Sequence, residues 1–127
     1  MTENHRSGLV PYLHYEELVP ILEWLARVFG FTERQRWPDA QGVVRNAEMI
    51  VADTEVWLDR SPGWWDKRGG RPDQWIGVWV DDVDAIYERV KAAGVAPKTA
   101  PEDKPYGVRT FNVEDPGGYT WGFMRRI

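Results

Sequence analysis

A strand and a helix follow one another in residues 75–94, WIGVWVDDVDAIYERVKAAG. In residues 75–80, aliphatic side chains alternate with tryptophan and glycine, which is the two-residue period of a β-strand. The aspartates at 81–82 offer an N-cap, an apolar stripe at helical spacing covers residues 83–93, and Gly94 is a natural helix stop. The stretch therefore predicts a strand that leads directly into an amphipathic helix.

The first half of the chain repeats this order. A strand-like run at Leu9–Tyr15 is followed by a helical stripe that starts near Pro20 and ends at Gly30, 64 positions before Gly94. Such spacing favours an internal duplication. Further strand-like runs follow each helix: Phe31–Trp37, Val43–Val51 and Thr54–Asp59 in the first half, and Val108–Val113 and Tyr119–Met124 in the second.

Two βαβββ modules are the predicted architecture, an α+β fold in which a curled mixed sheet encloses a cavity. We expect one domain over residues 1–127, since its length suits a single core. The first module covers residues 9–60 and the second 74–124. The connecting segment at 61–73 is polar and rich in glycine and proline, which predicts a mobile loop.

Composition excludes several classes of function. A net charge of −4 argues against nucleic acid or an anionic membrane as a partner, because neither is drawn to an acidic surface. The chain has no cysteine, which excludes disulfides and thiolate metal sites. No segment approaches 18 consecutive apolar residues. A soluble cytoplasmic protein is the resulting expectation.

Eight tryptophans are unusual in 127 residues. In the run at 75–80 the aliphatic residues should face the helix, so Trp75 and Trp79 should lie on the opposite face, with Gly77 between them leaving room for a flat group. The run at 54–59 places Glu55 and Trp57 on an equivalent face. Two such faces curled toward each other predict an aromatic-lined cavity.

Local motifs also resemble the vicinal-oxygen-chelate superfamily, in its glyoxalase, bleomycin-resistance and dioxygenase branch. The resemblance covers nearly the whole chain, and it implies a fold of paired βαβββ modules that usually forms homodimers. The motifs are Pro11-Tyr-Leu-x-Tyr15, Trp24-Leu-Ala-x-x-Phe-Gly-Phe31, Asn46-Ala-Glu-Met49, Val80-Asp-Asp-Val-Asp84, Lys91-Ala-Ala-Gly94 and Val113-Glu-Asp-Pro-Gly-Gly-Tyr-x-Trp-x-Phe123.

The same resemblance implies where metal ligands would stand in metal-dependent members. The corresponding positions here are Val10, Trp57, Trp75 and Gly122, and none of these side chains binds a divalent cation. Only two histidines exist, His5 near the N-terminus and His14. We therefore expect no metal, no other cofactor and no assigned catalytic residue.

Some metal-free members of the superfamily bind a drug between aromatic side chains and withhold it from its target. This sequence resembles that type, which predicts a homodimeric, non-catalytic protein that sequesters a planar aromatic small molecule and confers antibiotic resistance. The expected ligand-binding residues are Tyr12, His14, Trp37, Glu55, Trp57, Trp64, Trp65, Trp75, Trp79 and Tyr106.

Other interpretations stay open. The protein could be a lyase, isomerase or dioxygenase, either with a metal or with Glu55 or His14 as a base, or an accessory protein that binds a biosynthetic intermediate. The Trp64-Trp65 pair could form a lid or a dimer contact. Trp24 and Trp121 are expected in the core, Asp59 at a solvated rim, and Asp115-Pro-Gly-Gly118 in a simple turn.

Overall fold

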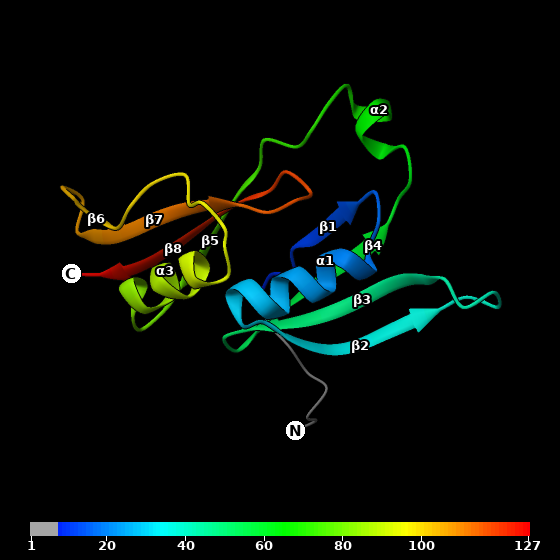
Figure 1. The fold of residues 1–127 in the computed structure, drawn as a ribbon, viewed down its shortest axis with the longest axis horizontal. Helices are drawn as coiled ribbons and strands as arrows, with labels where there is room; N and C mark the ends of the chain where they lie inside the picture. Colours follow the sequence, from blue (N-terminus) through cyan, green and yellow to red (C-terminus); the bar gives the residue numbers. More distant parts are fainter. Residues whose placement is uncertain (1–7) are drawn as a thin grey trace.

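A computed structural model describes residues 8–127 and contains the two expected modules (Figure 1). The first consists of β1 (Tyr12–Tyr15), α1 (Val19–Trp24), the π-helix η1 (Leu25–Phe29), β2 (Thr32–Pro38), β3 (Val44–Val51) and β4 (Thr54–Arg60). A short helix, α2 (Trp64–Arg68), lies in the connecting segment. The second module consists of β5 (Trp75–Trp79), α3 (Val83–Ala92), β6 (Glu102–Lys104), β7 (Val108–Glu114) and β8 (Thr120–Arg126).

Each module forms its own four-stranded mixed sheet. The strand orders are β1-β4-β3-β2 and β5-β8-β7-β6, so the two sheets have the same topology. The first strand of each module runs parallel to the last, and the other neighbours are antiparallel. The predicted α+β fold of paired βαβββ modules is confirmed.

The helix signals in the sequence act as expected. Pro20 lies in the first turn of α1, where a missing N–H costs nothing, and Gly30 ends the π-helix with a φ of 79°. The carboxylate of Asp82 caps α3 by accepting a hydrogen bond from the backbone N–H of Ala85 at 3.0 Å.

Three elements differ from the sequence-based boundaries. β1 begins at Tyr12 rather than Leu9, and Leu9 is exposed. The polar edge strand β6 carries no apolar alternation, so its residues gave no strand signal. Part of the predicted loop is helical, because the Glu16 carboxylate accepts hydrogen bonds from the backbone N–H groups of Gly63 and Trp65, both at 2.9 Å.

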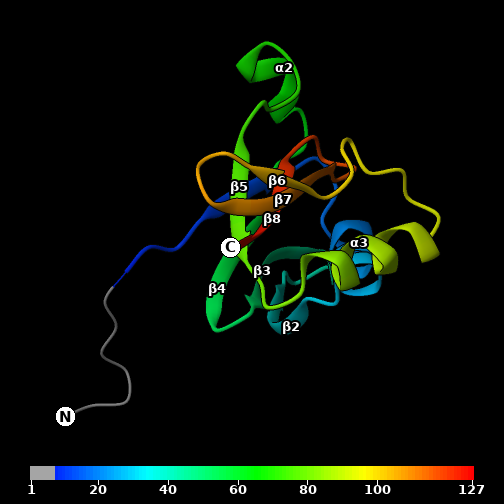
Figure 2. The ribbon, with the colours of Figure 1, turned by 90° about the vertical axis from the view of Figure 1, so that its left-hand side faces the viewer.

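An aromatic cluster joins the two modules in the core. Phe29 and Phe31 of the first module contact Trp121 and Phe123 of the second, with ring centroids 4.9–6.4 Å apart. The helices α1 and α3 lie near each other in both views, whereas α2 stands apart from them (Figures 1 and 2). The Arg89 guanidinium of α3 donates to the carbonyl of Ala26 at 3.3 Å at the end of the first helix.

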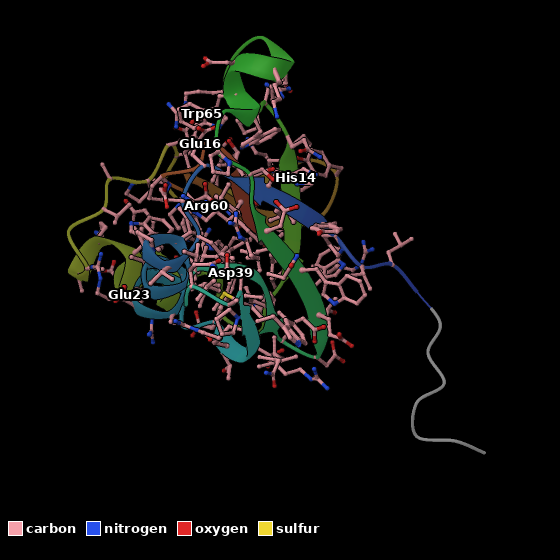
Figure 3. All side chains as sticks on the ribbon, turned by 90° about the vertical axis from the view of Figure 1, so that its right-hand side faces the viewer. His14, Glu16, Glu23, Asp39, Arg60 and Trp65 are labelled. Carbon is pink, nitrogen blue, oxygen red and sulfur yellow. The ribbon has the colours of Figure 1, made fainter. Side chains whose placement is uncertain are left out.

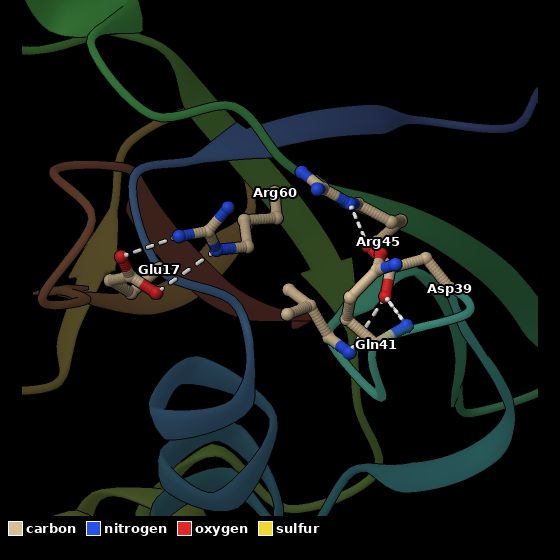
Figure 4. Close-up of polar contacts among 6 residues, drawn as sticks. Glu17, Asp39, Gln41, Arg45 and Arg60 are labelled. Carbon is tan, nitrogen blue, oxygen red and sulfur yellow. Dashed lines mark hydrogen bonds and ion pairs between the residues drawn. The ribbon is translucent and has the colours of Figure 1, made fainter.

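Polar contacts fix the ends of the first sheet (Figure 4). Arg60 at the end of β4 makes a bidentate pair with Glu17, with both N···O distances at 3.1 Å. In the β2–β3 turn, Asp39 accepts the backbone N–H of Gln41 at 2.8 Å and the Arg45 guanidinium at 2.9 Å.

None of the helices in residues 8–127 is both long and apolar enough to cross a bilayer.

Candidate ligand-binding site

Each sheet has one face covered by helices and one open face. On β4 the buried side chains are Val56 and Leu58, whereas Trp57 between them is half exposed, as the strand alternation predicts. On β5 the same alternation leaves Trp75 and Trp79 half exposed. The first face is the open surface of the first sheet and consists of Tyr12, His14, Trp37, Asn46, Glu48, Glu55, Trp57 and Asp59. The second face is the open surface of the second sheet and consists of Trp75, Gly77, Trp79, Asn112, Gly122, Met124 and Arg126.

The first face is hollowed. A cavity of about 270 Å³ opens over it, and the Tyr12 and Trp57 rings meet edge to face there with centroids 6.3 Å apart. The Trp57 indole N–H donates to Glu55 at 3.1 Å, which fixes the ring. The cavity lining consists of Tyr12, Trp37, Asn46, Ala47, Glu48, Trp57 and Leu58.

A hydrogen-bonded group lies beside this hollow. His14 Nδ1 is 2.8 Å from the Asp59 carboxylate, and the Ser61 hydroxyl donates to the same oxygen at 2.7 Å. The His14 ring stacks on Tyr12, with centroids 5.2 Å apart. Partial burial and then the Asp59 charge raise the pKa of the Tyr12 hydroxyl. Asp59 was expected at a solvated rim, but its side chain is only 18% exposed because it is held by these partners.

The second face is a flat platform. The Trp75 indole N–H donates to the Asn112 side chain at 2.8 Å. The ring covers Gly77 and Gly122 so closely that a Cβ on either glycine would overlap it. The room that the sequence predicts beside Gly77 for a flat ligand is therefore filled by the Met124 side chain and the Trp75 ring, which leaves the outer side of the indole for stacking.

Trp79 extends the platform toward the C-terminal end of β8. The Arg126 guanidinium lies 4.6 Å from its ring centroid, a cation–π distance. Sequence reasoning assigned no role to Asn112 or Arg126. Strand alternation on β7 and β8 could have placed both on the open face, but it could not reveal which tryptophan each one contacts.

The tryptophans of the connecting segment separate into two environments. Trp64 lies at the edge of the first face, with its ring 5.5 Å from that of His14 and stacked on Tyr119 at 6.3 Å. Trp65 instead lines another hollow of about 300 Å³, together with Tyr15 and Pro20. Figure 3 shows Trp65 and Glu16 near each other, with His14 on the strand beyond them.

Tyr106 is not brought to either face. It lies in the turn between β6 and β7 and is 71% exposed. Trp24 packs against the core and Trp121 is fully buried, so both expectations for these tryptophans are confirmed.

The positions implied for metal ligands hold apolar side chains or no side chain. Val10 is exposed before β1, Trp57 is bonded to Glu55, and Trp75 covers Gly122. Within residues 8–127, no group of three or more histidine, cysteine, aspartate or glutamate side chains is placed to hold a metal ion. His5 lies outside the described residues, and the expectation of a metal-free protein stays a prediction.

Asp115 has a larger role than the simple turn expected from the sequence. Its buried carboxylate accepts the Tyr15 hydroxyl at 2.7 Å, the Trp121 indole N–H at 2.9 Å, and the backbone N–H groups of Gly117 and Tyr119 at 2.9 and 3.1 Å. Burial raises the pKa of Asp115 although these donors oppose the shift. Because Tyr15 lies on the buried side of β1, this carboxylate connects the second module to the strand that carries Tyr12 and His14 on its open side.

Known proteins resemble this chain in sequence and fold. Residues 16–123 match the family model described as the Glyoxalase/Bleomycin resistance protein/Dioxygenase superfamily. An uncharacterised protein of Mycobacterium bovis is 30% identical over 135 residues, which cover 100% of this chain and 88% of that protein. The crystal structure of TioX from Micromonospora sp. ML1 superposes with a TM-score of 0.79 at 31% identity, covering 96% of this chain and 100% of TioX.

A bleomycin-binding protein solved in complex with bleomycin has the same fold. It superposes with a TM-score of 0.74 at 19% identity and covers 96% of this chain and 100% of its own.

Proposed function

This chain belongs to the Glyoxalase/Bleomycin resistance protein/Dioxygenase superfamily, and within it we propose a binding protein that sequesters a planar aromatic small molecule without altering it. One observation carries the proposal: five large aromatic side chains on the two open faces are 40–53% exposed. Isolated apolar side chains are common on surfaces, but contiguous aromatic patches usually mark binding sites. The five are Tyr12, Trp37, Trp57, Trp75 and Trp79.

The energetics of stacking support such a ligand. An aromatic contact contributes about 0.5–1.5 kcal/mol beyond burial, and removal of apolar area from water adds roughly 25 cal/mol per Å². Micromolar affinity needs about 8 kcal/mol. A flat ring system that buries both of its sides against indoles therefore needs no covalent chemistry or metal to bind at this level.

We further propose a homodimer in which the first face of one subunit lies opposite the second face of its partner. The first face carries the carboxylates Glu55 and Asp59, together with Glu48, which is paired with Arg34 at 2.6 Å, whereas the second face carries Arg126. Opposite charge favours this pairing over two first faces. The ligand would then stack between the hollow around Trp57 and the platform of Trp75.

The bleomycin-binding protein of the same fold supports the drug-sequestration interpretation, because its structure holds bleomycin. The ligand of this chain is proposed to be an antibiotic of the flat aromatic type. The cytoplasmic location expected from the sequence stays a prediction.

A second candidate function is catalysis with His14 as a general base. The 2.8 Å contact between His14 Nδ1 and Asp59 favours it, since a carboxylate that orients an imidazole is a common arrangement for a base. The two functions differ in the fate of the ligand, which is unchanged after sequestration and altered after catalysis.

The experiment is a fluorescence titration with daunorubicin, proflavine and bleomycin, followed by mass spectrometry of the recovered compound. We expect saturable quenching by at least one compound, which is recovered intact. Trp57→Ala and Trp75→Ala should each weaken binding roughly 2- to 12-fold, the equivalent of one stacking contact. Trp24→Phe, a change at the core side of α1, is the matched control and should leave the affinity unchanged.

Two results would contradict sequestration. Absence of saturable quenching by all three compounds would remove the support for an aromatic ligand. Recovery of a modified compound, with loss of that activity in His14→Ala, would replace sequestration by catalysis.

A further inference from the structure

The contacts of His14 determine which of its ring nitrogens carries hydrogen. The oxygen of Asp59 that lies 2.8 Å from Nδ1 also accepts the Ser61 hydroxyl at 2.7 Å. An ionised carboxylate only accepts hydrogen bonds, so Nδ1 must be the donor. In a neutral imidazole the second nitrogen, Nε2, then has a free lone pair and can only accept.

The imidazole is held in place on several sides. Its ring stacks on Tyr12 with an interplanar angle of 29° and lies 5.5 Å from the Trp64 ring. Asp59 fixes the rotation of the ring plane. The His14 side chain is nevertheless 45% exposed, and Nε2 has no hydrogen-bond partner among residues 8–127. An oriented acceptor is therefore available at an open face.

Strand register places this acceptor beside the aromatic hollow. β1 and β4 run parallel, with Tyr12 opposite Trp57 and His14 opposite Asp59. The histidine pair is thus two residues along the same face from the aromatic pair, roughly 7 Å away. Because the Tyr12 and Trp57 rings meet at 74°, a flat ligand ring can stack on only one of them, and a ring that stacks on Trp57 would present its edge to Tyr12 and His14.

We propose that Nε2 of His14 accepts a hydrogen bond from the ligand, so that the ligand class is a planar aromatic compound with a neutral hydroxyl on its ring edge. This inference rests on the proposed aromatic-binding function and specifies it. A carboxylate or phenolate is disfavoured, because it would meet the negative charge of Asp59 and because Nε2 of the neutral imidazole has no hydrogen to donate. A ring hydroxyl satisfies both conditions.

The test compares 2-naphthol with 2-methoxynaphthalene by equilibrium dialysis. The two compounds have the same fused ring system, but only the first has a hydroxyl hydrogen. We expect 2-naphthol to bind roughly 5- to 10-fold more tightly, the contribution of one hydrogen bond between neutral groups. In His14→Phe, which keeps a ring against Tyr12 and Trp64, this preference should disappear.

Two further variants isolate the role of Asp59. Asp59→Asn should reduce the preference, because an amide can donate to Nδ1 and leave the hydrogen on Nε2. Glu88→Gln, which removes only a surface charge near Lys91 on α3, should keep the preference intact. The ¹⁵N shifts of the imidazole in the native protein should report the Nδ1–H tautomer.

The outcomes separate this inference from the function on which it rests. If both compounds bind the native protein equally, aromatic binding stands and the acceptor role of His14 is overturned. An Nε2–H tautomer in the ligand-free protein would overturn it as well. If neither compound binds although daunorubicin, proflavine or bleomycin does, aromatic binding stands and the proposed ligand class is overturned. If none of the five compounds binds, the aromatic-binding proposal fails as well.

Discussion

The two open faces have the same strand topology but present different surfaces. The last strand of the first module carries Trp57 on its open face, and the last strand of the second module carries Gly122. Around Trp57 the surface is a hollow of about 270 Å³ that holds a carboxylate–histidine pair. Over Gly122 the Trp75 ring lies flat, so the second face is an indole platform.

One residue on each last strand accounts for much of this difference. On β4, the Trp57 side chain projects from the sheet and leaves space between its ring and those of its neighbours. On β8, Gly122 has no side chain, so the Trp75 ring of the adjacent strand packs flat against the backbone. The duplicated backbone therefore does not produce duplicated sites. The first face offers a flat ligand polar groups that can hydrogen-bond to its edge, and the second face offers a surface on which its ring can stack.

The largest effect is expected where the two modules that carry the faces are joined, at Asp115. Asp115→Ala leaves the buried Tyr15 hydroxyl and Trp121 indole N–H without partners, and we expect a loss of about 3 kcal/mol in the free energy of unfolding. Chemical denaturation measures this loss. Tyr15→Phe, which removes one of the four hydrogen bonds, should cost about 1 kcal/mol. Equal stability of Asp115→Ala and the native protein would show that this carboxylate does not hold the two modules together.

A smaller effect is expected from a substitution that places a side chain at Gly122 on the second face. Gly122→Val places its side chain where the Trp75 ring lies, so the indole must leave the sheet. We expect a loss of about 1–3 kcal/mol in the free energy of unfolding and a red shift of the tryptophan emission. Thr120→Val, on the same strand and the same face, is the control. An unchanged emission spectrum in Gly122→Val would contradict the stacked position of Trp75.

Much of the fold could be predicted from the sequence because its signals are local. The apolar stripes ending at Gly30 and Gly94 and the alternation in residues 75–80 report directly on helices and strands. β6 escaped prediction because its three polar residues pair only with β7 at the sheet edge. The helix α2 was not predicted because Glu16, whose carboxylate accepts the backbone N–H groups at its start, is distant in sequence.

The sequence could predict which side chains lie on the open face of each sheet, but not which of them contact one another. Strand alternation correctly placed Trp57, Trp75 and Trp79 on the open side, because the face to which a side chain points depends only on its position among its neighbours in the strand. The pairing of His14 with Asp59 depends on the parallel register of β1 and β4, and no local pattern encodes that register. For the same reason the contact between Trp75 and Asn112, 37 positions apart, was not foreseen.

The anchoring of the two faces can be compared through one asparagine on each. Asn112→Ala removes the acceptor for the Trp75 indole N–H, a 2.8 Å bond, whereas Asn46→Ala removes a longer donor contact to the Tyr12 hydroxyl at 3.3 Å. We expect Asn112→Ala to accelerate hydrogen exchange at the Trp75 indole and to cost at most about 1 kcal/mol, because water can replace the partner at this exposed site. Asn46→Ala should cost less. The reverse order of the two costs would contradict the view that the platform depends on a single anchor.

The smallest effect concerns α2, which brings Trp64 against His14 on the first face and has no counterpart on the second. The backbone N–H of Trp65, and then that of Gly63, lower the pKa of Glu16 below its ordinary value of 4.5. A carboxyl whose folded pKa is depressed stabilises the folded form fully above its unfolded pKa, and this stabilisation is lost as the pH falls through the folded pKa.

Acidification from about pH 6 to about pH 3 should therefore loosen α2 before the sheets unfold, with a change in the emission of Trp64. Glu16→Gln should lack this step, because an amide does not titrate in that range. Glu17→Gln, which alters the neighbouring pair with Arg60 instead, should retain it. A step of the same size in Glu16→Gln would assign the transition to another carboxyl. The contact of Trp64 with His14 would then be independent of the cap, and the first face would keep its shape in acid by its strands alone.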